Sequence, residues 1–166
     1  GYGYMGKSLA ERLTGFGVNV IAYDKYLKNY GSKFVKEVPL SEVYDSADFV
    51  SLHTPLSSET VKMVNKSFIN NFKKPFYLIN TARGKSVVLK DLLVALNNGV
   101  VKGACLDVIE TESSSFEKLD HINDLDFIAL SKMQNVVFSS HIAGWTFESK
   151  KKMAAIILEK IKDNFI

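Results

Sequence analysis

The sequence predicts an α/β fold built on a parallel β-sheet, because strand-like and helix-like segments alternate along the chain. The strand-like segments are short apolar runs bounded by polar or structure-breaking residues, a pattern typical of buried parallel strands. The helix-like segments repeat apolar residues at helical spacing. A glycine-rich run opens the first of them. Repeated strand–helix units of this kind predict one parallel sheet with helices on both faces.

Five β-rich runs are predicted to be strands. The run VNVIAY ends in Asp24, FVSLH is stopped by Pro55, and VVFS runs into His141. The runs FYLIN and VKGACLD lie between them and end in polar residues. In chain order the predicted strands are residues 18–23, 49–53, 76–80, 101–107 and 136–139.

Four segments are predicted to be helices. The first follows the glycine-rich run, and the third is rich in leucine and is stopped by Gly99. The last and longest repeats Met153, Ile156 and similar residues at helical spacing. The polar segment 113–132 is predicted to be an insertion or a long loop with some helix. In chain order the predicted helices are residues 6–14, 41–46, 91–98 and 146–165.

Composition and charge narrow the functional classes. The 166 residues are 46% hydrophobic and 23% charged, which is typical of a single globular, soluble domain over residues 1–166. The net charge of +3 is too small to indicate a nucleic-acid partner, and no apolar run is long enough to span a membrane. Cys105 is the single cysteine and is expected in the core, so no disulfide can form within the chain and we expect a cytoplasmic protein. No cluster has the spacing of metal ligands, so no metal site is predicted.

The run GYGYMG at residues 1–6 has the spacing G-x-G-x-x-G. In a dinucleotide-binding turn, a glycine at Gly1 permits the tight turn, Gly3 lets the backbone approach a pyrophosphate, and Gly6 lets the helix pack close to the sheet. The helix that follows would point its N-terminal N–H groups at the phosphates. Glycines also occur in ordinary turns, so this run alone is a weak indication.

Asp24 strengthens this interpretation. It lies 18 residues after Gly6, at the end of the next predicted strand, and the motif expects an acidic residue about 20 residues on that binds the ribose hydroxyls. Asp is also common in strand-ending turns, but glycines, strand and acid in this order favour a dinucleotide site on a Rossmann-type doubly wound sheet. A carboxylate here repels a 2′-phosphate, so NAD is favoured over NADP. Lys25 follows at once and could soften that preference.

Five separated blocks, in the right order, resemble the NAD-binding domain of the D-isomer-specific 2-hydroxyacid dehydrogenases. They are GYGYMG at 1–6, LHTPLSSET at 52–60, INTARG at 79–84, GACLDV at 103–108 and SSHIAG at 139–144. The insertion and the HIAGWT block look most like the D-3-phosphoglycerate dehydrogenase-like branch. The resemblance implies an NAD-dependent oxidoreductase that interconverts a D-2-hydroxy acid and a 2-oxo acid, of the 3-phosphoglycerate or hydroxypyruvate type. It also implies a homodimer formed through this domain.

The resemblance assigns three catalytic residues. Arg83 is implied to bind the carboxylate and carbonyl of the 2-oxo acid, a task that suits a planar, permanently charged guanidinium. His141 is implied to move the proton, since imidazole has an unperturbed pKa of about 6.5. Glu112 is implied to pair with His141 and to raise its pKa. Glu110 competes with Glu112 for this role, and Ser113 stands where the family usually has proline.

The same blocks imply the residues that contact the cofactor. His53 is expected to line the cofactor cleft without a catalytic role, and Asp107 to bind the nicotinamide carboxamide, with a strand-end turn as the alternative. His121 is expected to be exposed, and Trp145 either packs at the domain junction or edges the substrate cleft. The implied cofactor-binding residues are Gly1, Gly3, Tyr4, Met5, Gly6, Asp24, His53, Thr54, Pro55, Thr60, Thr81, Ala82, Arg83, Asp107, His141, Ala143 and Gly144.

Two other functions are compared with this interpretation. Some relatives are NAD-sensing transcriptional corepressors with similar cofactor and active-site residues, so an NAD-sensing binding protein is the alternative from another functional class. Binding of partner peptides without turnover of 2-oxo acids would favour it. Formate dehydrogenase has a similar cofactor domain but carries Gln in the position of the Glu, so Glu112 argues against it.

The chain begins within the predicted phosphate-binding turn, so we expect an N-terminally incomplete domain. The strand that should lead into Gly1 and the substrate domain are both outside the sequence. That strand is central in the usual order of this fold, so the strands at 18–23 and 49–53 would lack their shared partner. We therefore expect the isolated chain to be poorly folded and inactive.

Overall fold

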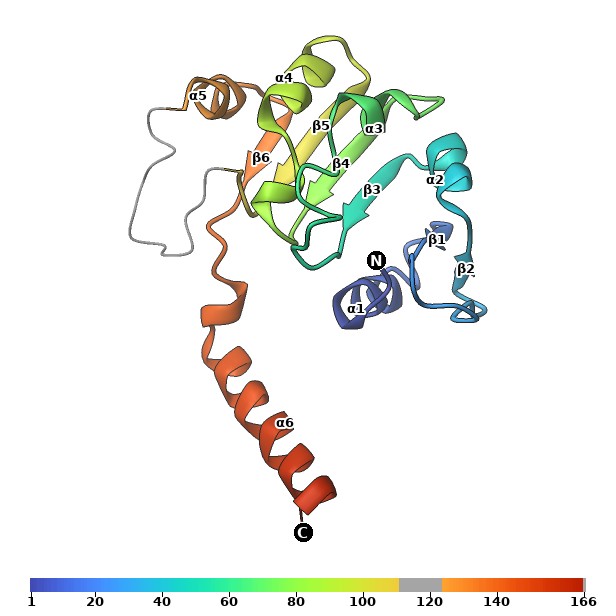
Figure 1. Cartoon of the computed structure of the whole chain (residues 1–166), viewed down its shortest axis with the longest axis vertical. Coiled ribbons are helices and arrows are strands. Elements are labelled where there is room, and N and C mark those ends of the chain that lie inside the picture. The colour runs from blue at the N-terminus through green and yellow to red at the C-terminus, as the bar shows by residue number, and fades with distance from the viewer. Residues whose placement is uncertain (111–123, 166) are drawn as a thin grey trace.

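The computed structural model describes residues 1–110 and 124–165 and contains two parallel sheets (Figure 1). The small sheet pairs β1 (Val20–Ala22) with β2 (Val35–Glu37). The main sheet has the order β3-β4-β5-β6. Its strands are β3 (Phe49–Leu52), β4 (Phe76–Asn80), β5 (Val101–Leu106) and β6 (Val136–Phe138). All neighbouring strands in both sheets are parallel, which confirms the predicted α/β class.

Helices connect these strands. In chain order they are α1 (Tyr4–Arg12), α2 (Leu40–Ser46), α3 (Lys66–Asn70), α4 (Leu89–Asn97), α5 (Leu125–Ser131) and α6 (Phe147–Phe165). The predicted helices agree with α1, α2, α4 and α6 to within about two residues at each end, a usual uncertainty for helix ends. The sequence missed α3 and β2, which are short, and α5 lies in the segment predicted to hold some helix. Within the described ranges, none of the helices combines the length and apolar character that crossing a membrane needs.

The core lies between the main sheet and the helices α3, α4 and α5. Phe76, Leu78, Leu92 and Val101 have no measurable solvent exposure. Burying such a side chain stabilises the fold by about 1.5–3 kcal/mol. Because these residues come from β4, α4 and β5, the core fixes the ends of two central strands relative to each other.

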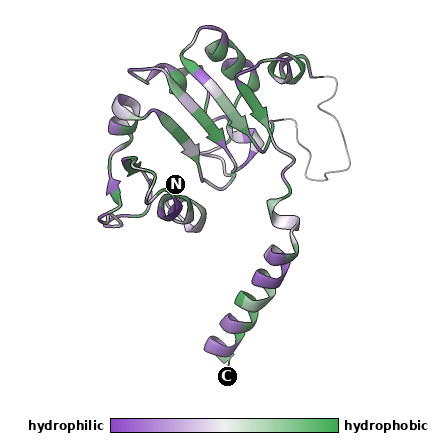
Figure 2. Ribbon diagram, turned by 180° about the vertical axis from the view of Figure 1, so that it is seen from behind, coloured by the Kyte–Doolittle hydropathy of each residue, from purple (hydrophilic) through white to green (hydrophobic). Residues whose placement is uncertain are grey.

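The opposite face of the main sheet is exposed. Phe49 and Val137 are 65% and 59% exposed, and Figure 2, which views the molecule from behind, shows the strands on this side unobstructed. The sequence predicts helices on both faces of the sheet. Among the described residues, helices cover only one face of the main sheet. The prediction that Cys105 lies in the core is wrong, because side chains alternate along β5 and Cys105 points away from the buried Ala104 and Leu106.

The strands β1 and β3 belong to separate sheets, as the sequence predicts for the strands at 18–23 and 49–53. The N-terminal residues lie against the ends of both strands. The amino group of Gly1 donates to the carbonyl of Tyr23 at 2.9 Å, just after β1. A side chain on Gly1 would meet the carbonyl oxygen of His53, just after β3, at 2.6 Å. The glycine run therefore lies at the carboxyl ends of β1 and β3.

Candidate functional site

The predicted site residues gather at one edge of the sheets, because each follows a strand and the strands are parallel. Asp24 follows β1, His53 follows β3, Arg83 follows β4, Asp107 follows β5 and His141 lies beyond β6. The arrowheads of β3 to β6 end at this edge in Figure 1. Ligands of open parallel sheets bind beyond the carboxyl ends of the strands, which makes this edge the candidate site.

The glycine run forms a tight turn that opens α1. A side chain on Gly6 would meet the carbonyl oxygen of Gly1 at 2.4 Å, so both glycines are required by close backbone approaches. Gly3 is different, because a side chain there would meet nothing within 4 Å. It precedes α1 without a side-chain cap, and the first N–H groups of a helix have no partner within the helix. The turn thus offers an open, backbone-lined site of the kind that binds anions.

Asp24 is held by backbone N–H groups. Its Oδ2 accepts from Tyr2 at 2.8 Å, and its Oδ1 accepts from Tyr26 and Leu27, each at 2.9 Å. Burial alone would raise the pKa of Asp24, but these donors outweigh burial and lower it. The side chain is therefore an ionised carboxylate at neutral pH, fixed at the end of β1.

The segment after β3 contributes His53, Thr54 and Thr60. His53 is half-buried with Nε2 2.9 Å from the hydroxyl of Ser51, and burial lowers its pKa, which favours the neutral imidazole. The hydroxyl of Thr54 is buried without a hydrogen-bond partner in the described structure. The hydroxyl of Thr60 instead closes a turn by donating to the carbonyl of Pro55 at 2.6 Å. The hydroxyl of Thr54 thus lacks a partner, whereas that of Thr60 is used in the turn.

The turn after β4 carries Arg83 and is anchored by Asn80, which the sequence analysis missed. The fully buried Asn80 accepts from the N–H of Ala82 at 3.1 Å and donates to the carbonyl of Arg83 at 3.0 Å. Arg83 is exposed, and its Nη1 donates to the carbonyl of Ala82 at 2.6 Å. A side chain on Gly84 would collide with the carbonyl of Ile109 at 1.8 Å. The glycine therefore lets this turn pack directly against the segment after β5.

Asp107 fastens the segment that contains His141. Its Oδ1 accepts from the hydroxyl of Ser139 and from the backbone N–H of His141, the latter at 3.0 Å. His141 has φ of 52°, a left-handed conformation that is uncommon for residues other than glycine. Such conformations persist where the surrounding structure enforces them. Asp107 and His141, predicted separately, are thus brought together, with Asp107 bonded to the backbone of His141.

Glu110 is occupied elsewhere. Its Oε2 accepts from the N–H of Leu89 at 3.0 Å, the first residue of α4. A carboxylate there satisfies one of the unpaired N–H groups of the helix and complements its dipole. Glu112 and His121 lie outside the described residues, so the predicted pairing of Glu112 with His141 stays a prediction.

The remaining predicted residues lie near the same edge or beyond it. Tyr4 and Met5 begin α1 and are 92% and 70% exposed. Ala143, Gly144 and Trp145 form a 3₁₀ turn after His141, and Trp145 is 61% exposed. No group of His, Cys, Asp and Glu among the described residues could hold a metal ion.

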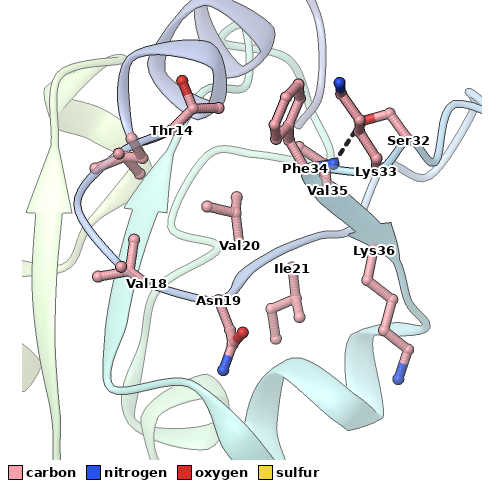
Figure 3. A pocket seen from close by; sticks show the side chains of 13 residues that line it. Thr14, Val18, Asn19, Val20, Ile21, Ser32, Lys33, Phe34, Val35 and Lys36 are labelled. Carbon is pink, nitrogen blue, oxygen red and sulfur yellow. Dashed lines mark hydrogen bonds between the residues drawn. The ribbon is translucent and has the colours of Figure 1, made fainter.

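A pocket of about 420 Å³ lies away from this edge, beside the small sheet. Figure 3 shows its lining, in which Val18, Ile21 and Val35 present apolar side chains. None of the predicted site residues lines it. The candidate site is thus an open strand edge, and this pocket contributes no chemical groups to it.

The chain matches the model of a known protein family over most of its length. Residues 1–143 match the D-isomer specific 2-hydroxyacid dehydrogenase, NAD binding domain. Among curated proteins, glyoxylate reductase of Korarchaeum cryptofilum is 35% identical over 97% of this chain and 46% of its own length. D-lactate dehydrogenase of Streptococcus agalactiae is 36% identical over 92% of this chain and 48% of its own length. The chain therefore spans about half the length of the curated relatives it matches.

Solved structures show the same similarity. The NAD-complexed D-isomer specific 2-hydroxyacid dehydrogenase of Lactobacillus delbrueckii ssp. bulgaricus superposes with a TM-score of 0.85 at 37% identity. The match covers 96% of this chain and 50% of that protein. The parallel sheets of this chain therefore follow the architecture of this solved relative.

Proposed function

Because this chain belongs to the D-isomer specific 2-hydroxyacid dehydrogenases, as their NAD binding domain, we propose that the full-length protein transfers hydride between NAD(H) and a D-2-hydroxy acid/2-oxo acid pair. One observation carries the proposal. The glycine turn and Asp24, which suit a dinucleotide, share a strand edge with Arg83 and His141, which suit a 2-oxo acid. The cofactor would supply or accept the hydride, and the protein would position the reactants.

The described residues fit a dinucleotide. The open space at Gly3 and the uncapped start of α1 provide backbone N–H groups for phosphates. Asp24 provides an ionised carboxylate for ribose hydroxyls.

Each catalytic residue has one task in the reduction of a 2-oxo acid. Arg83 would bind the substrate carboxylate through two hydrogen bonds of its guanidinium. As the carbonyl carbon receives the hydride with its electron pair, His141 would give a proton to the carbonyl oxygen, which yields the D-2-hydroxy acid. In the reverse direction His141 would take that proton back. Glu112 would stabilise the protonated imidazole.

The substrate and the assembly belong to the same proposal. The sequence favours an acid of the 3-phosphoglycerate or hydroxypyruvate type, whereas the names of the relatives add glyoxylate and D-lactate to the candidates. All of these share a carboxylate next to the reacting carbon, the feature that Arg83 would bind. We also propose a homodimer formed through this domain, which light scattering on the full-length protein would test.

Turnover by the full-length protein tests the function. Purified protein with NADH should reduce at least one of 3-phosphohydroxypyruvate, hydroxypyruvate, glyoxylate and pyruvate. NADH should be preferred to NADPH by at least about tenfold in kcat/KM, which is roughly 1.4 kcal/mol. Tight NADH binding with no turnover of any 2-oxo acid would instead favour an NAD-sensing binding protein. Equal use of NADPH would contradict the role given to Asp24.

A further inference from the structure

The segment after β1 carries a cation beside its acidic residue. Lys25 follows Asp24 directly. A basic residue near this position accommodates the 2′-phosphate of NADP in dinucleotide-binding folds. The sequence alone therefore leaves two outcomes for Lys25, because its ammonium group either attracts that phosphate or is used elsewhere.

Glu59, from the segment after β3, contacts this cation. Its Oε1 lies 2.5 Å from Nζ of Lys25, and its Oε2 accepts from the hydroxyl of Tyr26. Lys25 and Tyr26 are neighbours in the segment after β1. A single carboxylate thus ties the segment after β1 to the segment after β3, at the carboxyl ends of two strands that belong to separate sheets.

The turn that carries Glu59 is braced on both sides of that residue. The N–H of Ser57 donates to the hydroxyl of Thr60 at 2.7 Å, and this hydroxyl donates to the carbonyl of Pro55 at 2.6 Å. The N–H of Val61 donates to the carbonyl of Ser57 at 2.9 Å. The position of the Glu59 backbone is therefore fixed by its own turn, independently of Lys25.

The charges around Lys25 are constant at neutral pH. The hydrogen bond from Lys25, followed by that from Tyr26, lowers the pKa of Glu59, and the bond to Glu59 raises the pKa of Lys25. Asp24 is ionised as well, because backbone donors lower its pKa despite burial. Glu59 thus balances the charge of Lys25, and Asp24, the preceding residue in the chain, keeps its own negative charge.

We propose that Glu59 is a specificity-determining residue for the cofactor. Its carboxylate neutralises Lys25 and leaves the negative charge of Asp24 unopposed, so the site disfavours a dinucleotide that carries a 2′-phosphate. The inference rests on the proposed function, since it takes the edge beyond β1 as the ribose site. The side chains of Lys25 and Glu59 are 56% and 46% exposed, and exposed ion pairs contribute little to stability. Breaking the pair should therefore change stability little, so its effect on ligand binding can be measured on folded protein.

Direct binding to the full-length protein tests this role without relying on turnover. Isothermal titration calorimetry would give the Kd of NAD⁺ and of NADP⁺ for the wild type, Glu59→Gln, Lys25→Met and the double variant. Glu42→Gln is the matched control, because Glu42 forms a comparable exposed ion pair with Lys36, at 2.6 Å, outside the candidate site. Glu59→Gln should bind NADP⁺ about fivefold more tightly and NAD⁺ with little change, a size expected for exposed charges.

Two further results are expected. The gain for NADP⁺ should shrink as salt rises, since the screening length falls from about 30 Å at 0.01 M to about 10 Å at 0.1 M. It should also disappear in the double variant, because the released ammonium of Lys25 is then absent. The inference fails if the wild type binds NAD⁺ but Glu59→Gln leaves the ratio of the two Kd values unchanged, or if Glu42→Gln changes it equally. A wild type that binds neither dinucleotide would overturn the proposed function and this inference together.

Discussion

Asn80 offers the sharpest test of how the candidate site is built. Its side chain is fully buried and makes two hydrogen bonds to the turn that carries Arg83. Asn80→Ala would remove both bonds while keeping the backbone carbonyl of residue 80, which accepts from the N–H of Asp107 at 3.0 Å. The substitution therefore acts on the Arg83 turn and leaves the link between β4 and the segment after β5 in place.

The structure sets the size of the effect. A buried polar group left without its partner costs about 1–3 kcal/mol. In Asn80→Ala, the N–H of Ala82 and the carbonyl of Arg83 would each lose their hydrogen-bond partner. We expect the free energy of unfolding to fall by about 2–6 kcal/mol. Gly84 would keep its close packing against Ile109, so the turn should shift on its β4 side only. A shift of about 1 Å in a substrate-positioning group can cost about a hundredfold in rate, and we expect KM for the 2-oxo acid to rise at least about tenfold.

Three measurements on the full-length protein separate positioning from stability. Urea unfolding gives the change in stability, steady-state kinetics gives KM and kcat, and NADH titration gives the Kd of the cofactor. Asn135→Ala is the matched control, because Asn135 is exposed and donates to the carbonyl of Lys102 at 2.8 Å, before β6. A rise in KM without a comparable rise in the Kd of NADH would support the positioning role. Asn80→Ala with wild-type KM and wild-type stability would refute the reasoning.

Three other predictions use single substitutions. His141→Ala should slow turnover by about a hundredfold or more, measured by stopped-flow at saturating NADH, and a parallel NADH titration gives the part of the loss that comes from cofactor binding. Burial lowers the pKa of His53 below 6.5, so the unfolded chain takes up the proton first as pH falls. Stability should therefore decline from pH 6.5 towards the lowered pKa of the folded state, and His53→Gln should lose this decline in melts over a pH series. Glu112→Gln should lower the pKa of the proton donor in the pH–rate profile. Glu110→Gln should leave that pKa in place and reduce stability by about 0.3–1 kcal/mol, because the helix dipole of α4 loses a negative charge while the amide oxygen can still accept from Leu89. The reverse result would transfer the role to Glu110.

The strands of the main sheet were predictable because each is an apolar run that ends in polar residues. The runs FVSLH, FYLIN, VKGACLD and VVFS correspond to β3, β4, β5 and β6. By contrast, β2 consists of Val-Lys-Glu and pairs only with β1, so its local sequence carries no strand signal. Cys105 was misplaced because an apolar run suggests burial on both faces, whereas one face of this sheet is exposed.

The positions of the site residues were predictable, but several of their contacts were not. The carboxyl ends of parallel strands lie at one edge of a sheet regardless of which side chains follow them. The order of the motifs along the chain therefore predicted that Asp24, Arg83 and His141 lie at the same edge. The sequence shows that the run FYLIN ends in a polar residue, Asn80. Its two hydrogen bonds could not be predicted, because they depend on the backbone path of the next three residues. The pairing of Lys25 with Glu59 joins residues 34 positions apart and needs the three-dimensional structure.

Acidic side chains near this edge act largely on the backbone of the protein itself. Asp24 accepts from Tyr2, Tyr26 and Leu27, Asp107 accepts from His141, and Glu110 accepts from Leu89. Each carboxylate therefore shapes a segment that carries candidate site residues, in addition to any contact with a ligand. Spacing in the sequence identifies where such acids stand, since they follow strands. It does not divide them into ligand-binding and structural residues, because that division depends on which backbone N–H groups the neighbouring turns leave without a partner.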